Sequence, residues 1–550
     1  MKKQNLKSFH FALHVDPAEA VCHGVQGECV TIPHTWNVQP GMEDYAGTAW
    51  YSTEFEVETP ADKTVLYFHG AYRDCTVYVN GGVACIHSGS GYTPFEADVS
   101  HLVVAGENLL TVSCSNAYSD KTLPHRKDFD WANDGGLIRP VELLQYDAGE
   151  AEHICIESIV TEFLPGGLAD AWVNCKFDFS VSAPAQYDVC VREYKSKKVV
   201  FERSGCSGRE IVFPLCGVTL WNTEDPFLYE LELRTPASVQ TRRFGVRKLE
   251  ARGKKIYLNN KPIRLLAVEW MPGSNPAFGM AEPESELAKN LAMLKDLKCN
   301  FTRFHWQQDD FVYDWCDEHG LMVQEEIPYW GSPKAAGRVQ FDVAERQADE
   351  MLRYHFNHPS IVCWGVGNEL GGWEKETCLY VRHMVSYFKL RDSMRLVNYV
   401  SNTVGWKSPH LLHPGREATT YGDICMWNEY LGTWYSVPKR GYDKVFRRVL
   451  KYCGDKPVVI TEFGLCEPAH KGGDTRRIEI YREKLEYYQK YDLAGWVYFC
   501  LNDYRTHIGE TGEGRFKQRI HGSVDLCGAK KPSYAFIQTQ NLAAQNDNKG

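Results

Sequence analysis

The chain has 550 residues, and its 61 lysines and arginines against 71 aspartates and glutamates leave a formal net charge of −10 at pH 7. This acidic balance argues against a nucleic-acid partner, because a protein that binds the phosphate backbone needs a basic face. Aromatic residues make up 13% of the chain, which excludes a disordered protein. No run approaches the roughly 18–20 apolar residues of a membrane helix, so we expect no membrane partner.

The cysteines and the start of the chain bear on location. Nineteen cysteines are spread from Cys22 to Cys527 without a Cys-x-x-Cys pair, whereas zinc sites and disulfide frameworks show tighter, paired spacing. We therefore expect reduced thiols, no metal and no cofactor. Basic residues open the chain, but the apolar stretch of a secretory signal does not follow them. These features predict a cytoplasmic protein.

The chain up to residue 248 has the pattern of β-structure. Short alternating segments separated by turn residues occur at 50–58, 64–70, 75–82 and 108–116, and they predict a jelly-roll-like β-sandwich over residues 1–148. Further alternating segments at 175–183, 187–194 and 229–234 predict an immunoglobulin-like β-sandwich over residues 149–248.

From residue 263 onward, apolar segments alternate with amphipathic helical segments, which is the pattern of βα units. Eight candidate strands follow in order: 263–270, 300–306, 321–328, 361–369, 396–402, 424–430, 457–464 and 493–500. Candidate helices lie at 284–297, 342–356, 375–390, 442–452 and 476–491. This count is typical of a TIM barrel, so we predict a TIM (β/α)8 barrel over residues 249–550.

Two glutamates stand at the ends of predicted barrel strands, where TIM barrels carry their chemistry. Glu369 ends the fourth strand in WGVGNE, and Glu462 ends the seventh in VITEFG. Because these strands lie across the barrel mouth from one another, the two carboxylates can flank one bond. Hydrolysis of a glycoside with retained configuration needs such a pair, about 5–5.5 Å apart, one as nucleophile and the other as acid.

Other acidic residues compete for these roles. Asn428 and Glu429 repeat the Asn-Glu dipeptide at the end of the sixth strand, and Glu325 and Glu326 close the third. The dipeptide alone leaves Glu429 open as the acid, whereas the strand count favours Glu369.

The order of short motifs along the chain resembles glycoside hydrolase family 2. Its sugar-binding β domain resembles the segments PHTW (33–36), WY (50–51), VNG (79–81), PFE (94–96) and GLIRP (136–140). Its barrel is similar to the one opened by LNNKP (258–262), with the acid/base motif at HPSI (358–361) through NE (368–369) and the nucleophile motif at TEFG (461–464). KPSY (531–534) looks like the family's closing strand-to-helix segment.

The resemblance implies a retaining exo-β-glycosidase that removes a terminal β-linked hexose or hexuronic acid through a glycosyl-enzyme, as β-glucuronidases and β-galactosidases do. Glu462 would be the nucleophile, and Glu369 would be general acid and then general base, its pKa raised by the charge on Glu462. Asn368 would hydrogen-bond the sugar 2-hydroxyl group. Tyr430 would orient the nucleophile, and Arg303 would keep it ionised.

The resemblance also predicts contacts outside the barrel. A loop of the first domain, carrying Asp130 and Trp131, should reach the barrel mouth. The expected partners are a small glycoside or oligosaccharide and further copies of the chain, because the family resemblance favours a homo-oligomer.

The chain departs from the family pattern at three places. After the second strand, the well-known members carry Arg-x-Ser-His-Tyr-Pro, whereas this chain has RFHWQQ at 303–308, so His305 has only an approximate role. Phe499 stands where the family has a floor tryptophan, although Trp496 is close in sequence. The Asn-x-Lys motif with which β-glucuronidases recognise the sugar carboxylate is replaced by QRIHG at 518–522.

A row of cations offers another way to bind a uronate carboxylate. Four of them are spaced by two, so that an extended segment puts them on one face: Arg515, Lys517, Arg519 and His521. Two more precede them in the same loop: Arg505 and His507. The row either holds a carboxylate or is neutralised by its acidic neighbours, Glu510, Glu513 and Asp525.

The sugar therefore stays open between a glucuronide, a galactoside, a β-galacturonide and an α-L-arabinopyranoside. A non-catalytic carbohydrate-binding protein built on an inactive barrel is the alternative of a different class. Such proteins usually lack one of the two carboxylates, and here neither Glu369 nor Glu462 is missing.

Overall fold

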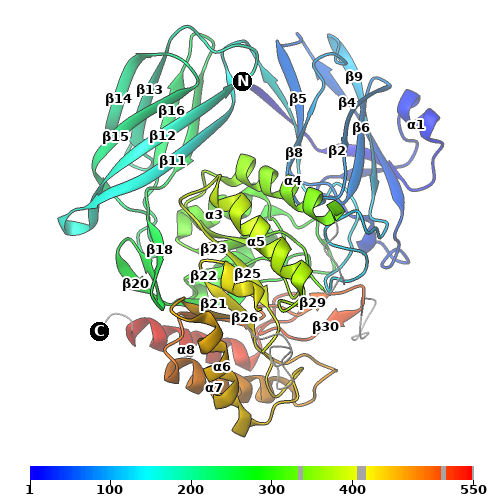
Figure 1. Cartoon of the computed structure of the whole chain (residues 1–550). Helices are drawn as coiled ribbons and strands as arrows, with labels where there is room; N and C mark the ends of the chain where they lie inside the picture. The colour runs from blue at the N-terminus through cyan, green and yellow to red at the C-terminus, as the bar shows by residue number, and fades with distance from the viewer. Residues whose placement is uncertain (332–337, 405–415, 509–515, 548–550) are drawn as a thin grey trace.

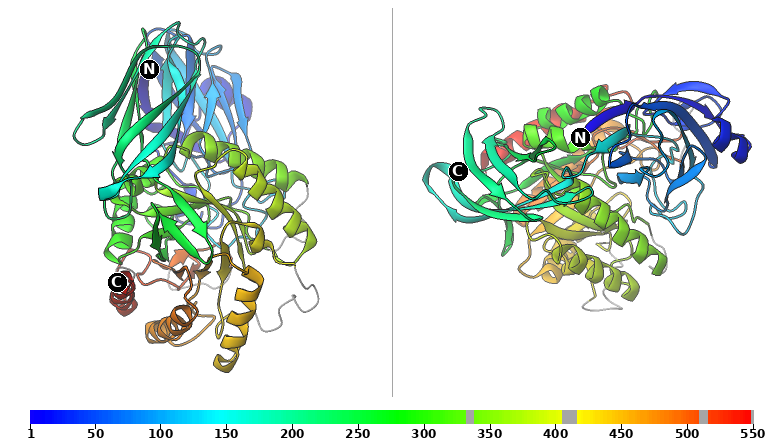
Figure 2. Two further views of the ribbon diagram at one scale, coloured as in Figure 1. Left: turned by 60° about the vertical axis from the view of Figure 1, so that its left-hand side comes forward. Right: turned by 90° about the horizontal axis from the view of Figure 1, so that it is seen from above.

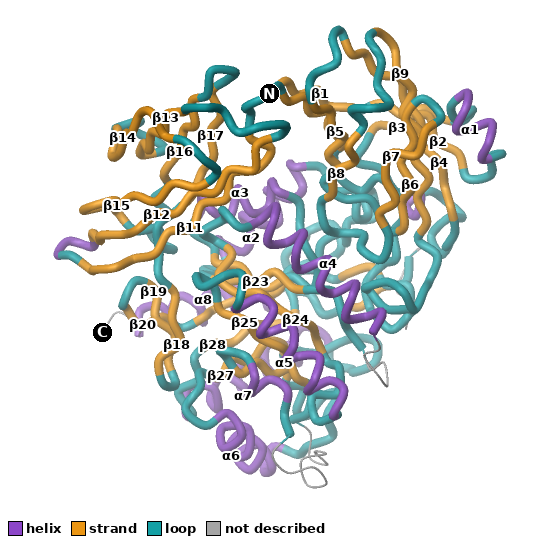
Figure 3. The backbone as a smooth tube through the Cα atoms, turned by 45° about the horizontal axis from the view of Figure 1, so that its top comes forward, coloured by secondary structure: helices purple, strands orange, loops and turns teal. Residues whose placement is uncertain are grey.

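The computed structural model describes residues 1–331, 338–404, 416–508 and 516–547. Two β-sandwiches lie side by side, and both adjoin a barrel that holds the C-terminal half of the chain (Figures 1 and 2). Strands make up the sandwiches, whereas most helices surround the barrel (Figure 3). This arrangement confirms the predicted fold class. None of the helices in the described ranges is long and apolar enough to cross a membrane.

The first sandwich pairs a four-stranded sheet with a six-stranded one. The smaller sheet runs in the order β1 (Lys2–Leu6), β10 (Val141–Tyr146), β5 (Lys63–Phe68) and β8 (Phe95–Asp98). The larger runs β3 (Glu28–Thr31), β2 (Ser8–Ala12), β4 (Thr48–Val57), β9 (Gly106–Ser115), β6 (Asp74–Val79) and β7 (Gly82–His87), and α1 (Pro17–His23) lies beside it. Apolar residues from both sheets, such as Phe68 and Val112, share one core.

The second sandwich has one sheet of three strands and one of four. The first contains β11 (Ala151–Phe163), β12 (Leu168–Phe179) and β15 (Glu210–Thr219), and the second contains β14 (Val199–Cys206), β13 (Tyr187–Glu193), β16 (Tyr229–Arg234) and β17 (Val239–Phe244). Along β12, buried residues alternate with more exposed ones, because the strand covers a core on one face only. We keep as a proposal the division of the chain into residues 1–148, 149–248 and 249–550. The regular strands are interrupted between β10 and β11 and again after β17, which supports this division.

A small sheet leads from the second sandwich into the barrel: β18 (Leu249–Arg252), β19 (Lys255–Leu258) and β20 (Lys261–Ile263). Its Ile256 and Leu258 pack in one cluster with residues of the barrel strands. The barrel itself is closed by eight strands in chain order: β21 (Leu265–Glu269), β22 (Phe301–Arg303), β23 (Met322–Glu326), β24 (Ile361–Asn368), β25 (Leu396–Ser401), β26 (Cys425–Asn428), β27 (Val458–Glu462) and β28 (Gly495–Phe499). Each of them overlaps one of the eight predicted strands.

The helices of the barrel region are α2 (Glu284–Asp296), α3 (Asp310–His319), α4 (Arg338–His355), α5 (Lys375–Lys389), α6 (Tyr442–Cys453), α7 (Gly473–Lys490) and α8 (Pro532–Asp547). Helix α3 was not among the predicted ones. Asp309 caps its first turn by accepting from the Phe311 amide, and Gly320 ends it in the left-handed conformation, which glycine adopts without steric cost. Beyond β28, a two-stranded ribbon of β29 (Tyr504–Arg505) and β30 (Gln518–Arg519) adjoins the barrel.

Candidate active site

A cavity of about 300 Å³ lies at the C-terminal ends of the barrel strands. Nine of the predicted site residues line it: Asp130, Trp131, His305, Glu369, Tyr430, Glu462, Phe499, Arg519 and His521. Asn368 and Arg303 are wholly buried behind this lining. A cavity of about 720 Å³ lies between the first sandwich and the barrel, and one of about 740 Å³ lies where both sandwiches meet the barrel; neither is lined by a carboxylate that ends a barrel strand.

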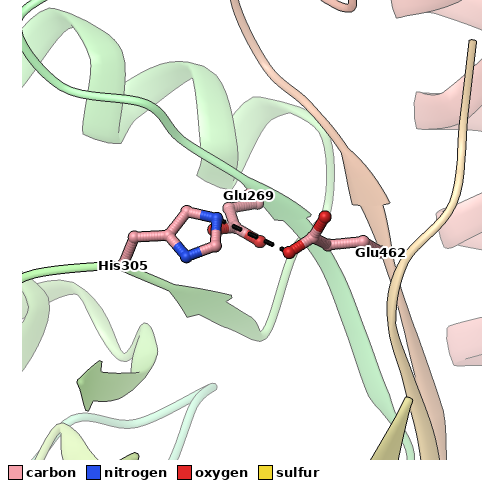
Figure 4. A group of neighbouring side chains, drawn as sticks. All are labelled: Glu269, His305 and Glu462. Carbon is pink, nitrogen blue, oxygen red and sulfur yellow. Dashed lines mark ion pairs between the residues drawn. The ribbon is translucent and has the colours of Figure 1, made fainter. Parts of the chain in front are cut away.

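Glu462 is the last residue of β27, and its carboxylate is held from two sides. The Arg303 guanidinium donates from Nη1 to Oε1 at 2.9 Å, and the Tyr430 hydroxyl donates to Oε2 at 2.8 Å. His305 Nε2 lies 3.5 Å from the same Oε1 (Figure 4). The guanidinium and the phenol hydroxyl group thus fix the positions of both carboxylate oxygens, the first through a charge-assisted hydrogen bond.

Glu369 follows β24 directly, and its backbone has a φ of +55°. This left-handed conformation is uncommon for a residue with a side chain. It breaks the alternation of a strand, so that Asn368 and Glu369 are both directed to the site. Burial and the negative charge of Glu462 raise the pKa of Glu369 to about 7, although Asn428 donates to its Oε1 at 2.8 Å. Glu369 can therefore carry a proton near neutral pH.

Asn428 links the two sides of the site. Its Nδ2 donates to Asn368 Oδ1 at 3.1 Å as well as to Glu369, and its Oδ1 accepts from the Thr461 hydroxyl at 2.9 Å. The Nδ2 of Asn368 has no hydrogen-bond partner among the described residues, although it is buried. A buried donor without a partner is costly, so this amide is a candidate for binding a ligand hydroxyl group.

A buried ion-pair network lies beneath Glu462. Arg303 contacts three carboxylates, those of Glu462, Glu269 and Glu326, and its Nη2 lies 2.8 Å from Glu326 Oε1. Burial raises the pKa of Glu269 to about 7, although Arg303 and His305 oppose this shift. The pKa of Glu326 is lowered despite its burial, mainly because of Arg303. One guanidinium is therefore shared by more acidic groups than it can neutralise.

The competing glutamates take other partners. Glu429, unlike Glu369, does not have a positive φ. Its carboxylate accepts from Lys484 Nζ at 2.5 Å and from the Tyr488 hydroxyl at 2.6 Å, and both donors are on α7. Glu429 does not line the cavity. Glu325 likewise turns away to His355 Nδ1, at 2.8 Å.

Lys484→Met is expected to destabilise the barrel by about 3–5 kcal/mol, because it leaves the buried Glu429 carboxylate without its cation. Urea unfolding followed by tryptophan fluorescence measures the change. Adding Glu429→Gln to the same chain should recover most of the loss, since a neutral amide no longer needs a cation. A single variant as stable as the wild type would show that the pair contributes nothing.

The loop of the first domain meets the barrel at the cavity. The Asp130 carboxylate accepts from Arg519 Nε at 3.1 Å and from the Tyr504 hydroxyl at 2.8 Å. The Trp131 ring stacks on Trp306, with 4.5 Å between centroids, and also faces His305. Phe499 lies edge-on to His521 at 4.9 Å, whereas Trp496 is not among the residues that line the cavity.

The row of cations does not form one face. Lys517 pairs with Asp44 at 3.1 Å, Arg505 pairs with Asp134 at 2.6 Å, and the His507 ring contacts the Trp131 carbonyl oxygen. Of the cations of this row that the structure describes, only Arg519 and His521 line the cavity. Arg515, Glu510 and Glu513 lie outside the described residues. Asp525, the remaining acidic neighbour, accepts from backbone amides of its own loop instead.

Sequence reasoning missed several residues of this site. Glu269 ends the first strand, so the strand-end rule that identified Glu369 would have found it as well, whereas Glu326 was named only as a competing acid. Six cavity residues were also not anticipated: Met271, Trp330, Asn402, Trp434, Tyr435 and Tyr504.

Two groups of histidine and carboxylate side chains in the described residues place ligand-type atoms within 4.8 Å of one another. One is Glu269 with His305 and Glu462, and the other is Asp314 with Asp317 and His358. In the first group Arg303 contacts both carboxylates, and in the second Arg243 pairs with Asp314 while His358 pairs with Asp317. We therefore interpret both as ion-pair networks and assign no metal or cofactor to them.

Comparison with known proteins matches both ends of the chain to one family. The sugar-binding domain of glycosyl hydrolases family 2 matches residues 25–147, and the TIM barrel domain of that family matches residues 249–516. A putative β-glucuronidase of Formosa agariphila is 26% identical over 385 residues, which are 67% of this chain and 45% of the relative. The chain covers less than two thirds of the length of this and other curated relatives.

Solved structures share the fold along the whole chain. The β-glucuronidase of Bifidobacterium dentium in complex with coumarin-3-O-glucuronide superposes with a TM-score of 0.88 at 20% identity, covering 98% of this chain and 97% of that one. The β-galacturonidase of Eisenbergiella tayi bound to galacturonate superposes with a TM-score of 0.81 at 23% identity, with the same coverage. With two models of one family matched in order over most of its length, the chain belongs to glycosyl hydrolase family 2.

Proposed function

We propose that the protein hydrolyses terminal β-glycosidic bonds with retention of configuration, through a covalent glycosyl-enzyme. The observation that carries this proposal is a pair of glutamates that line one cavity and have different surroundings. Glu462 accepts hydrogen bonds from Arg303 and Tyr430, whereas burial and the nearby Glu462 raise the pKa of Glu369 to about 7. A nucleophile must be ionised and an acid protonated at the same pH, and these surroundings suit Glu462 to the first role and Glu369 to the second.

In the first displacement, a Glu462 oxygen forms a bond to the anomeric carbon as the bond to the aglycone oxygen breaks. Glu369 gives its proton to that leaving oxygen. In the second, a water molecule attacks the anomeric carbon, Glu369 takes the water proton, and Glu462 leaves as a carboxylate. The pKa of Glu369 falls once Glu462 has lost its charge, which suits the change from acid to base.

Asn368 is suited to hold the sugar in this cycle. Its Nδ2 is buried without a partner among the described residues, and its Oδ1 is fixed by Asn428. We propose that this amide donates to the sugar 2-hydroxyl group, an interaction that strengthens in the transition state of glycoside hydrolysis.

A panel of nitrophenyl β-glycosides tests the proposal, with the β-glucuronide, β-galacturonide and β-galactoside and the α-L-arabinopyranoside compared side by side. We expect release of nitrophenol from at least one of them. A carbohydrate-binding protein without catalysis is the competing function, and binding without turnover across the panel would favour it.

We propose a hexuronide as the preferred sugar. Arg519 and His521 both line the cavity, and a guanidinium can bind a carboxylate through two parallel hydrogen bonds. Asp130 holds Arg519 at this position at 3.1 Å. The fold is shared with proteins named β-glucuronidase and β-galacturonidase, which leaves the configuration of the uronide to the panel.

Arg519→Ala is expected to lower kcat/KM on the hydrolysed uronide by about 100-fold, the cost of one charge-assisted contact. Activity on the neutral galactoside should change far less, because that sugar has no carboxylate. Lys517→Ala is the matched control, since Lys517 lies two residues away and pairs with Asp44 outside the cavity. Equal losses on charged and neutral sugars would contradict carboxylate recognition by Arg519.

We also propose a cytoplasmic, homo-oligomeric enzyme. All nineteen cysteines are free thiols, as is usual in a reducing compartment. The homo-oligomer rests on the family resemblance, and light scattering on the purified chain tests it.

A further inference from the structure

Glu269, the last residue of β21, shares the Arg303 guanidinium and the His305 imidazole with Glu462 as close neighbours. Arg303 Nη1 lies 2.9 Å from Glu462 Oε1 and 3.2 Å from Glu269 Oε2. His305 Nε2 lies 3.5 Å from Glu462 Oε1 and 3.2 Å from Glu269 Oε1. Figure 4 shows the two carboxylates side by side, with the imidazole directed to both.

Ion pairing with Arg303 in the resting protein does not account for Glu269. Glu326 already binds the other edge of Arg303, with its two oxygens 3.1 and 2.8 Å from Nε and Nη2. Glu462 supplies a second negative charge. A third carboxylate, with 0% of its side chain exposed, is therefore surplus, and burying an extra acidic group is costly unless another state needs it.

The proposed reaction contains such a state. When Glu462 forms a bond to the anomeric carbon, its negative charge disappears, and Arg303 and His305 no longer have that charged acceptor. A buried guanidinium with one carboxylate fewer is less stable. Glu269 already touches both donors, so it can replace the missing acceptor without a large movement.

We propose that Glu269 is a positioning residue that takes over the donors of Arg303 and His305 when Glu462 becomes an ester, and thereby stabilises the glycosyl-enzyme. This inference rests on the proposed function, because it requires a covalent intermediate on Glu462. Apart from the loss of the Glu269 carboxyl proton to solvent, no further bond forms or breaks in this exchange; two N–H groups change their principal acceptor.

The titration of Glu269 supports this assignment. Burial raises its pKa to about 7, and the charge of Glu462 adds to the shift. Loss of that charge in the ester lowers the pKa of Glu269, so the carboxyl ionises, and its proton leaves to solvent through the cavity that His305 lines. The charged and titratable groups that face Glu269 come from four strands and their ends: Arg303, His305, Glu326, Glu462 and the Cys500 thiol.

Glu269→Gln tests the proposal, because glutamine keeps the shape but cannot ionise. The hydrogen bonds that ionised Glu269 accepts are strongest in the ester, partial in the transition states and weakest in the free enzyme. We therefore expect kcat/KM, which reports formation of the ester, to fall about tenfold. Reactivation of enzyme trapped with the 2-deoxy-2-fluoro form of the hydrolysed glycoside should become several-fold faster, since its starting state is destabilised. The differences between Glu269→Gln and the wild type, in kcat/KM and in the rate of reactivation, should be small at about pH 6 and grow towards pH 8, because glutamate ionises over this range and glutamine does not.

Two further variants separate this role from a structural one. Glu325→Gln is the matched control, because Glu325 is also a wholly buried strand carboxylate paired with a histidine, but on the outer side of the barrel. Glu325→Gln is expected to lower the unfolding temperature, but not to slow formation of the ester while speeding reactivation of the trapped enzyme. Glu269→Asp keeps the carboxylate but shortens the side chain by one methylene group. It should show slower formation of the ester and faster reactivation, both by smaller factors than Glu269→Gln. If Glu269→Gln does not fold, Glu269→Asp carries the test.

Slower formation and slower hydrolysis of the ester by the same factor would overturn the inference and leave Glu269 a structural residue. Rates in Glu269→Gln equal to those of the wild type would overturn it as well. Failure of the proposed function is distinguishable, since it is observed on the wild type alone as neither turnover nor trapping with any glycoside of the panel.

Discussion

Replacing Glu462 with alanine is expected to lower kcat by about 10⁴-fold or more on every glycoside that the wild type hydrolyses. The variant lacks the oxygen that attacks the anomeric carbon, so no glycosyl-enzyme can form. Folding should survive, because Arg303 keeps Glu269 and Glu326 as partners. Steady-state rates on an aryl glycoside and the unfolding temperature measure the two effects.

Added azide distinguishes a missing nucleophile from a damaged site. In Glu462→Ala, azide can occupy the vacated space and attack the anomeric carbon of an activated aryl β-glycoside, which gives the α-glycosyl azide. Glu325→Gln serves as control, because its buried carboxylate faces His355 rather than the cavity. Turnover of Glu462→Ala close to that of the wild type would show that another group is the nucleophile.

The second large effect is expected for Glu369→Gln, and it depends on the leaving group. Loss of a general acid costs about 10²–10⁴-fold, and we expect the upper part of this range for an alkyl aglycone that leaves only after protonation. An activated nitrophenyl group needs little protonation, so formation of the ester should slow far less with it. Equal losses on both substrates would argue against an acid role for Glu369.

The pH dependence provides an independent test of the same residue. Glu369 must be protonated to act as acid, and burial together with the charge of Glu462 raises its pKa to about 7. The kcat/KM of the wild type should therefore fall as the pH rises through about 7, and this decline should be reduced in Glu369→Gln. With Glu369→Ala, azide should give the β-glycosyl azide, the opposite configuration from that of Glu462→Ala, because the ester on Glu462 is then attacked from the other face.

The identical dipeptides 368–369 and 428–429 illustrate how far sequence reasoning could go. Both follow apolar strands, and the strand count favoured the first as the acid. The direction of the glutamate side chain distinguishes the two dipeptides. Glu369 has a φ of +55° and lines the cavity, whereas the side chain of Glu429 contacts Lys484 on α7. A backbone angle at one residue depends on packing around it, and the dipeptide does not encode that packing.

The cations beyond the eighth strand needed the tertiary structure for a different reason. Their spacing predicted one basic face, with neighbours in the same loop as the acidic partners. The partners come instead from the first sandwich, where Asp44, Asp130 and Asp134 pair with Lys517, Arg519 and Arg505. Pairs between residues more than 370 positions apart exist only once the sandwich is docked on the barrel.

The sequence by itself determined the two sandwiches, the eight-stranded barrel and the strand-end positions of Glu369 and Glu462, because strand periodicity and strand order are local properties of a chain. Beyond the Arg303–Glu462 contact that the family resemblance implied, tertiary structure decided which charges meet. It brought Glu269 from the first strand, Arg303 from the second and Glu462 from the seventh into one buried network, and it set Asp130 against Arg519. Ionisation depends on burial and on charges a few ångströms away, and both arise only when distant segments pack together.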